Sequence, residues 1–411
     1  MIPWKAIISR YGERPLFQEG GQPTSFSTFA SMVEAIRERM PVDGLTRLQS
    51  VELTWQADAF ARFLGMLEAG AAVLPGALPE NADLSCFGQD RPLLILRTGG
   101  TTGAPRHAVH AMARFLQRFE VRESSAGCLL VLYAPDHVAG LDAFFRALYG
   151  GSTLVVPEAR APEAIARAIG GHRVQVLPAT PSFLQFLLLS GALEGVPTDS
   201  VRIIPHGAEP MPPALRERIR AAFPQARLVQ RFGMTELGAL PVREDPEDPQ
   251  ALFLETEGHA WRVIDGELWI QCPARMLGTL EEGPLDPSDH WHPTGDLAET
   301  TPRGSIRILG RRESLINVGG EKVVPERVEA LLLEQPGVRD ASVYGIRHAL
   351  TGQAVAARVV GAPGLDIRAL QRSLRSAALR QGLPLAAVPT HLERVEVLGR
   401  TAAGKRSRRP L

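Results

Sequence analysis

A run of glycine, threonine and arginine directly after an apolar segment could hold the phosphates of a ligand. It reads Thr-Gly-Gly-Thr-Thr-Gly-Ala-Pro-Arg over residues 98–106, and the apolar residues 93–96 precede it. Glycines let backbone N–H groups approach an anion, while threonine hydroxyls and an arginine fork add donors. The candidate phosphate-binding residues are Thr98, Gly99, Gly100, Thr101, Thr102, Gly103 and Arg106.

More glycines, carboxylates and cations follow in short motifs further along the chain. They occupy residues 206–210 (HGAEP), 232–236 (FGMTE), 292–296 (HPTGD), 310–311 (GR) and 404–405 (GK). The first two of these motifs, like the glycine-threonine run, come after strand-like segments. Because ligands of open α/β sheets bind beyond the carboxyl ends of the strands, these segments are expected to converge on one site. The spacing of the first run is not that of a Walker A loop, so a P-loop nucleotide hydrolase is disfavoured.

The segment from about residue 50 to 240 alternates short apolar runs with helical patterns, which is typical of a parallel sheet with helices on both faces. Asp58 is expected to cap the first of these helices. Strands are predicted at residues 51–55, 71–74, 93–96, 128–133, 152–156, 174–177, 201–204 and 226–230. Helices are predicted at residues 58–67, 111–119, 140–148, 161–169, 181–189 and 212–223.

The pattern changes after about residue 250. Short alternating strands at 261–264, 268–272 and 305–309 indicate a small β-rich subdomain, and a charged, glycine-containing segment follows it. The remainder alternates helix and strand patterns and indicates a compact α+β unit. The sequence therefore predicts an α/β fold with a large domain over residues 1–310, built of mostly parallel sheets, and a small mobile domain over residues 311–411.

Bulk composition excludes several classes of protein. The 411 residues carry a formal net charge of zero, so no overall field draws the chain to nucleic acid or to an anionic membrane. Three widely spaced cysteines (Cys86, Cys128 and Cys272) argue against a disulfide framework. No signal peptide is evident, and no apolar run reaches the ~18 residues of a membrane span. We therefore expect a cytoplasmic protein without nucleic-acid or membrane partners.

Taken in order, the motifs resemble those of the adenylate-forming enzymes, a superfamily of acyl- and aryl-CoA ligases, peptide-synthetase adenylation domains and firefly luciferase. The resemblance runs from about residue 93 to the C-terminus and is closest to compact acyl-CoA ligases, with a truncated first subdomain. It implies that a small carboxylic acid is activated with ATP to an acyl-adenylate, releasing pyrophosphate, and then transferred to the thiol of coenzyme A. ATP, Mg²⁺ and coenzyme A, or the phosphopantetheine of a carrier protein, are the implied cofactors.

The resemblance also assigns roles to residues of the large domain. It implies that Glu236 binds Mg²⁺, Thr235 contacts the α-phosphate and Phe232 stacks on adenine. The backbone of Gly207, Ala208 and Glu209 would run alongside the adenine. Asp296 would accept the ribose hydroxyls with help from Arg311. At Arg106 the family usually has lysine, so this chain retains the charge but not its geometry.

The small domain would act in both half-reactions. Lys405 would bridge the carboxylate and the α-phosphate during adenylation, and Glu313 would lie at the hinge. After a domain rotation, the loop with Gly319, Gly320 and Lys322 would line the thiol tunnel.

The acid would be bound by His137, Gly233 and Met234 in a pocket whose neighbours Tyr133 and Leu141 suggest a largely apolar lining. The order of Asp136 and His137 does not match the pattern for an α-amino acid substrate.

Three alternatives to a CoA ligase stay open from the sequence. The acyl group could be loaded onto a carrier-protein phosphopantetheine, because both acceptors would enter through the same tunnel. The chain could be a nucleotide-binding protein that has lost catalysis, although Glu236 and Lys405 are both retained. The basic tail after residue 400 could bind nucleic acid, which the zero net charge disfavours.

Overall fold

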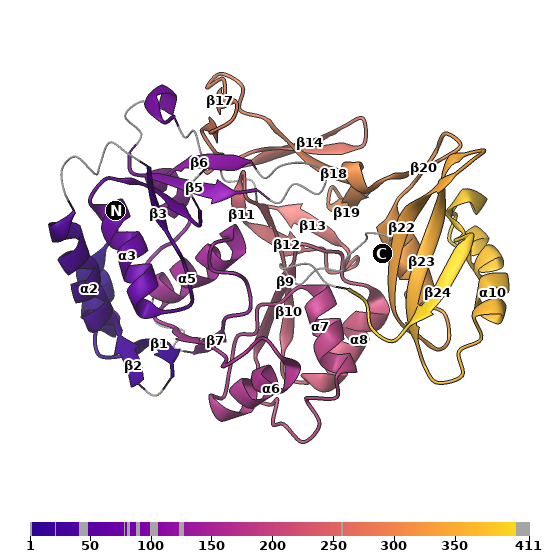
Figure 1. Ribbon diagram of the computed structural model, residues 1–411, viewed down its shortest axis with the longest axis horizontal. Coiled ribbons are helices and arrows are strands. Elements are labelled where there is room, and N and C mark those ends of the chain that lie inside the picture. Colours follow the sequence, from indigo (N-terminus) through magenta and orange to yellow (C-terminus); the bar gives the residue numbers. More distant parts are fainter. Residues whose placement is uncertain are drawn as a thin grey trace.

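The chain forms a large body and a smaller one beside it (Figure 1). The computed structural model describes residues 2–20, 22–40, 48–77, 79, 83–87, 91–98, 106–122, 127–255 and 258–399. Residues before about 310 make the large body, and residues 316–395, drawn in orange and yellow, make the small one. This arrangement agrees with the predicted α/β fold of a large N-terminal and a small C-terminal domain.

The residues before the glycine-threonine run build a substantial part of the large body. They form α1 (Trp4–Tyr11), β1 (Pro15–Glu19), β2 (Gln22–Ser25) and α2 (Phe26–Arg39), and the Ser25 hydroxyl caps α2 by accepting from the Thr28 N–H. Phe17 of β1 is fully buried and packs against Phe60 and Phe144, whose rings stack with centroids 4.2 Å apart. An aromatic core thus joins the N-terminal elements to the helices that follow.

One sheet has the order β2–β1–β8–β7, with β8 at Thr153–Val155 and β7 at Cys128–Leu130. Isolated bridges at Val176 connect it to a second run of strands, β9 (Ile203–Gly207), β10 (Arg227–Met234) and β11 (Gly238–Leu240). β1, β8 and β7 are parallel, as are β9 and β10, while β10 and β11 are antiparallel. The predicted strand at 174–177 is therefore reduced to single bridges.

A separate sheet has the order β17–β16–β6–β5–β4–β3. Its strands are β3 (Leu48–Val51), β4 (Ala72–Pro75), β5 (Leu93–Arg97), β6 (His107–Ala111), β16 (Gly278–Thr279) and β17 (Gly283–Pro284). β3, β4 and β5 are parallel, but β6 returns antiparallel to β5. The predicted single series is thus divided between two sheets, because the chain after β5 turns back as a strand instead of crossing over as a helix.

Helices cover these sheets close to the predicted positions. They are α3 (Ala57–Glu68), α4 (Met112–Leu116), α5 (Val138–Gly150), α6 (Pro162–Gly171), α7 (Pro181–Leu189) and α8 (Pro213–Ala222). Gln56, not Asp58, is the N-cap of α3, and Asp58 lies in the first turn, where it pairs with Arg62 at 2.9 Å. The prediction of a cap at Asp58 was therefore wrong by two positions. Within the described part of the chain, no helix has the length and apolar character to span a membrane.

The β-rich subdomain is an antiparallel sheet of order β12–β13–β19–β18–β15–β14. Its strands are β12 (Val242–Glu244), β13 (Ala251–Leu254), β14 (Ala260–Ile264), β15 (Glu267–Gln271), β18 (His292–Thr300) and β19 (Ile306–Arg311). A short 3-10 helix at Arg312–Ser314 then leads to the small domain.

The small domain packs two helices on a five-stranded sheet of order β21–β20–β23–β22, with β24 parallel to β23. Its elements are β20 (Ile316–Val318), β21 (Glu321–Val323), α9 (Pro325–Leu333), β22 (Val338–His348), β23 (Gly352–Gly361), α10 (Ile367–Arg380) and β24 (His391–Val395). It has its own apolar core, in which Val328, Val343 and Leu374 are fully buried.

Candidate active site

The two ends of the predicted phosphate loop meet at the end of the β5–β6 hairpin. The Thr98 N–H donates to the Arg106 carbonyl at 2.8 Å, which closes the loop at its base. The exposed Arg106 guanidinium forms an ion pair with Glu282 at 3.0 Å. Of the predicted loop residues, Gly99, Gly100, Thr101, Thr102 and Gly103 lie outside the described residues. The described residues of this motif are therefore the two ends of the connection between β5 and β6.

His110 connects this hairpin to the turn that carries Thr235 and Glu236. Its ring Nε2 donates to the Thr235 carbonyl at 2.8 Å, and the side chain is fully enclosed. Burial lowers the pKa of His110 to about 4, with the charge of Arg118 contributing, so the ring is neutral at pH 7. His110 is not among the residues predicted from the sequence. The feature that could have indicated it is a histidine within an apolar strand. It is the residue that physically joins two of the predicted motifs.

Glu236 lies at the centre of the turn between β10 and β11. Its carbonyl accepts from the Met276 N–H at 2.8 Å, which ties the turn to the segment leading into β16. Burial raises the pKa of the Glu236 carboxyl, and the positive charge of Arg311 opposes that shift. Glu236 is therefore a half-buried carboxylate whose charge interacts with that of Arg311, and its predicted role in binding Mg²⁺ stays a prediction.

Asp296 and Arg311 face one another on neighbouring strands. They are paired in the register of β18 and β19, and Arg311 Nε lies 2.9 Å from Asp296 Oδ1. Arg311 also donates from Nη1 to the Thr294 carbonyl at 3.0 Å, and the Thr294 hydroxyl accepts from the Asp296 N–H at 3.1 Å. Two residues predicted from separate motifs are thus brought together. The Asp296 side chain is only 8% exposed, so its carboxylate is held in a fixed orientation.

The segment with Gly207, Ala208 and Glu209 follows β9. The Glu209 carboxylate accepts from the Ser182 N–H at 3.0 Å and from the Ser182 hydroxyl, at the N-terminus of α7. An anion is favourable at that end of a helix, so the carboxylate has a structural partner. Gly207 has no room for a side chain, because a Cβ there would lie 2.4 Å from the Arg231 carbonyl oxygen. The Glu209 side chain therefore has a structural partner, and the predicted contact of this segment with adenine through its backbone stays a prediction.

The residues predicted to line the acid pocket surround the start of α5 and the end of β10. His137 is the half-buried N-cap residue of α5. On β10, Phe232 and Met234 are partly buried and pack against the apolar core of the β-rich subdomain, while the intervening Gly233 is exposed. Leu141 is fully buried in the aromatic core and does not line a pocket, so that part of the prediction was wrong.

The residues predicted in and before the small domain are at the surface where the structure describes them. Glu313 is exposed in the 3-10 helix after β19. Gly319 and Gly320 form the tip of the β20–β21 hairpin, where the Gly319 N–H donates to the Thr351 carbonyl at 3.0 Å. Lys322 is exposed on β21. Lys405 lies outside the described residues.

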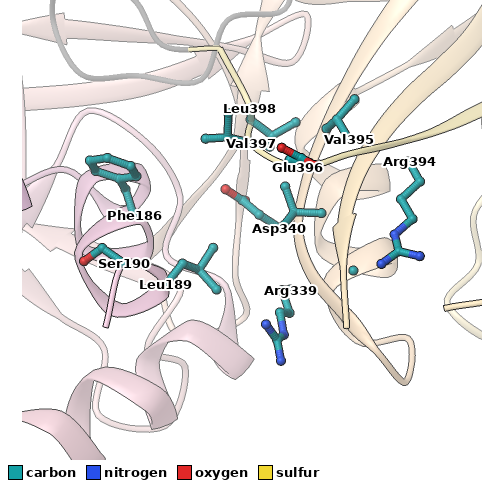
Figure 2. Close-up of a pocket in the computed structure, with 12 residues that line it drawn as sticks. Phe186, Leu189, Ser190, Arg339, Asp340, Arg394, Val395, Glu396, Val397 and Leu398 are labelled. Atoms are coloured by element: carbon teal, nitrogen blue, oxygen red, sulfur yellow. The ribbon is translucent and has the colours of Figure 1, made fainter. Parts of the chain in front are cut away.

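A cavity of about 600 Å³ lies between the two domains (Figure 2). Phe186 and Leu189 of α7 and the following Ser190 line one side, and residues of β22, β23, β24 and the segment after β24 line the other. Next to it, the Gln185 side chain donates to the Arg339 carbonyl and accepts from Arg218 Nη1, the latter at 3.2 Å. None of the residues lining the cavity belongs to the predicted site. The cavity marks the contact between the domains instead.

The donors available for Mg²⁺ are limited. The described part of the chain holds no group of three or more His, Cys, Asp or Glu side chains arranged around a metal ion. Mg²⁺ needs no such cage, since it commonly binds through one or two carboxylates together with substrate phosphates. The half-buried Glu236 carboxylate fits that mode of binding.

Comparisons with known proteins extend over both domains. The model of the AMP-binding enzyme family matches residues 46–263, and that of the AMP-binding enzyme C-terminal domain matches residues 327–405. A solved anthranilate CoA ligase in complex with anthranoyl-AMP has the same fold, with a TM-score of 0.80 at 16% identity over 98% of this chain and 95% of its own.

Two curated relatives show the range of activities in the family. A methyl-dioxo-octahydroindenyl-propanoyl:CoA ligase of Mycobacterium tuberculosis is 29% identical over 426 aligned residues, which cover 98% of this chain and 80% of the relative. An L-proline–L-prolyl-carrier protein ligase of Pseudomonas fluorescens is 27% identical over 345, which cover 77% of this chain and 66% of the relative. With the order of the motifs and the neighbouring Glu236, Asp296 and Arg311, these matches establish that the chain belongs to the AMP-binding enzyme family, the adenylate-forming superfamily.

Proposed function

We propose that this protein is an acid–thiol ligase that makes an acyl-CoA through an acyl-adenylate. The observation that carries the proposal is the convergence of Glu236 with the Asp296–Arg311 pair, beside a turn that His110 anchors to the base of the phosphate loop. A carboxylate for a divalent cation and a fixed carboxylate for two hydroxyls are what a bound nucleoside triphosphate needs.

The first half-reaction joins two anions. A carboxylate oxygen of the acid attacks the α-phosphorus of ATP, the bond from that phosphorus to the bridging oxygen breaks, and pyrophosphate leaves. No side-chain nucleophile is required, so the task of the protein is to align the two groups and neutralise their charge. In this proposal Thr235 contacts the α-phosphate and Lys405 bridges it to the carboxylate. Mg²⁺ held by Glu236 would offset the charge of the phosphates.

Residues 98–106 would hold the leaving pyrophosphate, and the backbone of residues 207–209 would pass the adenine, against which Phe232 stacks. Asp296 and Arg311 would hold the ribose. The acid would lie between His137 at the start of α5 and the end of β10, where Gly233 and Met234 lie.

In the second half-reaction a thiolate sulfur attacks the acyl carbon, the bond to the adenylate oxygen breaks and AMP leaves, with the thiol proton passing to solvent. The small domain would rotate about Glu313, withdrawing Lys405 and bringing Gly319, Gly320 and Lys322 to the thiol. The exposure of the hairpin tip supports this role, because a loop that enters a tunnel cannot be packed in a core.

Formation of AMP and pyrophosphate that depends on an added carboxylic acid tests the proposal. We expect some members of a panel of aliphatic, aryl and dicarboxylic acids to drive ATP–pyrophosphate exchange. Exchange with none of them would contradict the proposed function. In Lys405→Ala we expect adenylation to fall on the order of 1000-fold, with a much smaller effect on the thioesterification of a supplied acyl-adenylate. An equal loss in both steps would contradict the assigned rotation.

A carrier-protein phosphopantetheine is the second candidate acceptor, and the similarity to a carrier-protein ligase favours testing it. Replacing coenzyme A with holo carrier proteins in the thioesterification assay separates the two acceptors. Deleting residues 400–411 tests the remaining non-enzyme alternatives: we expect adenylation to be lost while the large domain stays folded.

A further inference from the structure

The Arg118 guanidinium is buried beside the turn that carries Thr235 and Glu236. Its Nη1 would lie 2.3 Å from a Cβ placed on Gly238, the first residue of β11, so the two groups are in direct contact. The guanidinium also lies over the rings of Phe115 and Phe119, 4.0 and 4.8 Å from their centroids. The side chain is only 14% exposed. These contacts hold a permanent positive charge in an apolar environment.

No nitrogen atom of this guanidinium has a hydrogen-bond partner among the described residues. Asp142 of α5 is close, with Oδ1 3.5 Å from Arg118 Nε, but that oxygen also lacks a hydrogen bond within the described chain. Buried N–H groups without partners cost free energy, and charged ones cost more. The guanidinium is therefore electrostatically paired but has unused donors.

Asp142 also forms an ion pair with a second arginine. Arg146, one helical turn further along α5, places Nε 2.6 Å from Asp142 Oδ2. One carboxylate thus faces two guanidiniums: Oδ2 is hydrogen-bonded to Arg146, while Oδ1 lies near Arg118 without a hydrogen bond among the described residues.

Arg231 of β10 adds a third positive charge. Side chains alternate along a strand, so Arg231 lies on the face opposite that of Phe232 and Met234, which pack against the β-rich subdomain. Burial lowers the pKa of Arg231, the charge of Arg146 adds to this effect and that of Asp142 opposes it. Arg118 and Arg146 thus both lie beside Asp142, and the charge of Arg231 also acts on this group, which has an excess of positive charge.

The position of this cluster relates it to the acid pocket. Gly238, which Arg118 contacts, is two residues beyond Glu236. Asp142 lies one helical turn, roughly 6 Å, along α5 from Val138, the residue after His137. A small acid whose reacting carboxylate lies near Thr235 and His137 would reach the cluster with its other end.

We propose that the acid substrate carries a second carboxylate, which Arg118 and Arg231 bind at the inner end of the acid pocket. This inference rests on the proposed function and names its substrate class. A carboxylate offers acceptors for the unused N–H groups and offsets the excess charge, and such charge-assisted contacts are among the strongest available. A purely apolar acid would leave the donors unsatisfied, so the cluster selects against it.

The test compares acids that differ only in the second carboxylate. Adipate is paired with hexanoate, glutarate with pentanoate and isophthalate with benzoate, in ATP–pyrophosphate exchange with the full chain. We expect kcat/KM to favour one or more of the dicarboxylates over its partner on the order of 100-fold. In Arg118→Met that ratio should fall close to 1, and Arg118→Lys, which retains the charge, should recover part of it.

Arg167→Met is the matched control. Arg167 forms an exposed ion pair with Glu158 at 3.3 Å, so its loss should leave the ratio unchanged. If Arg118→Met does not fold, as judged by circular dichroism, Arg118→Lys and Arg231→Met give the same comparison. Calorimetric titration of the preferred dicarboxylate, without ATP, measures binding independently of turnover.

The outcomes separate this inference from the proposed function. Monocarboxylates that match the dicarboxylates in the unmodified protein would overturn the inference and leave the proposed function standing. A dicarboxylate preference that survives both Arg118→Met and Arg231→Met would overturn the role of the arginines. If no acid drives exchange, the proposed function falls; dicarboxylate binding that Arg118→Met abolishes would still support the subsite, and absence of binding would overturn it.

Discussion

Two arginine–aspartate pairs lie near the turn that carries Thr235 and Glu236, and they differ in how completely their hydrogen bonds are made. Arg311 is 2.9 Å from Asp296 and also donates to a backbone carbonyl, with its side chain 41% exposed. Arg118 is 3.5 Å from Asp142, is 14% exposed and has no hydrogen bond within the described residues.

This difference bears on what each pair can do. The Asp296–Arg311 pair is complete by itself, so it offers a fixed carboxylate to neutral hydroxyls without needing a ligand to balance its charge. The Arg118–Asp142 pair leaves N–H groups of Arg118 without acceptors, and Arg146 shares its single carboxylate, so a ligand anion would complete it. Pairs of the same two residue types therefore suit two different parts of a substrate.

Among the further variants that test this comparison, the largest effect is expected from Asp296→Ala, which removes the carboxylate that Arg311 contacts. We expect the KM for ATP to rise about 100-fold, with a much smaller change in kcat, because the lost contact binds ATP rather than the reacting atoms. Steady-state kinetics with ATP as the varied substrate measures this. The exposed Asp199, 3.8 Å from Arg173, provides the control Asp199→Ala, which should leave the KM unchanged. An unchanged KM in Asp296→Ala would remove Asp296 from the ribose role.

His110 holds the turn that the two pairs share, and its burial makes stability depend on pH. With its pKa lowered to about 4, against about 6.5 in an unfolded chain, the unfolded state binds the proton more readily. The contribution of neutral His110 is therefore fully present above pH 6.5 and is lost as the pH falls towards 4. Between pH 7 and pH 5 the loss is about 2 kcal/mol.

Urea unfolding of the unmodified chain and of His110→Gln at pH 7, 6 and 5 measures this contribution. The variant lacks the titrating group, so the difference in unfolding free energy between the two proteins should shrink by that amount as the pH falls. A difference that stays constant over this range would show that His110 is not held neutral by burial.

Gly238→Ala is expected to displace Arg118 of the Arg118–Asp142 pair without touching the Asp296–Arg311 pair. Gly238 has a φ of +72°, and a Cβ there would lie 2.3 Å from Arg118 Nη1. We expect about 1–2 kcal/mol of destabilisation and a weakened preference for dicarboxylates, because the guanidinium must move. Gly195→Ala has the same backbone strain, with a φ of +74°, but no neighbouring atom within 4 Å, and should leave substrate preference unchanged. Equal behaviour of the two variants in thermal unfolding and exchange would show that the Arg118 contact is unimportant.

The smallest effect is expected from Arg167→Met, which removes an ion pair more exposed than either arginine–aspartate pair. Its partner Glu158 is 85% exposed, and surface ion pairs of this kind contribute about 0.5 kcal/mol or less. Chemical denaturation should show a change within that limit. A larger loss would mean that exposure is not what separates these pairs.

The motif residues were accessible from the sequence because their types and order carry the signal. The motifs alone predict Glu236, Asp296 and Arg311 as nucleotide- or metal-binding residues. The register of β18 and β19 places the last two opposite one another. Lys405 and the glycines of the phosphate loop lie outside the described residues, so their roles stay predictions.

Other residues could not be found in this way. Arg118 lies in a segment whose pattern predicts only a helix, and Asp142 lies on a different helix whose apolar residues dominate its pattern. Nothing in the local sequence indicates that they meet, or that Arg231 faces them from a strand. The same limit applies to Leu141, which was expected near the acid pocket: Leu141 is buried in the aromatic core, while its neighbour Asp142 pairs with arginines.

The sequence by itself determined the α/β class, the positions of most helices and strands, and the family, because these depend on residue patterns between near neighbours in the chain. Only the tertiary structure decided that the strands divide between two sheets, that His110 joins them at Thr235, and which charges share a carboxylate. Those properties depend on burial and on distances between segments far apart in sequence, and no local pattern of residues encodes them.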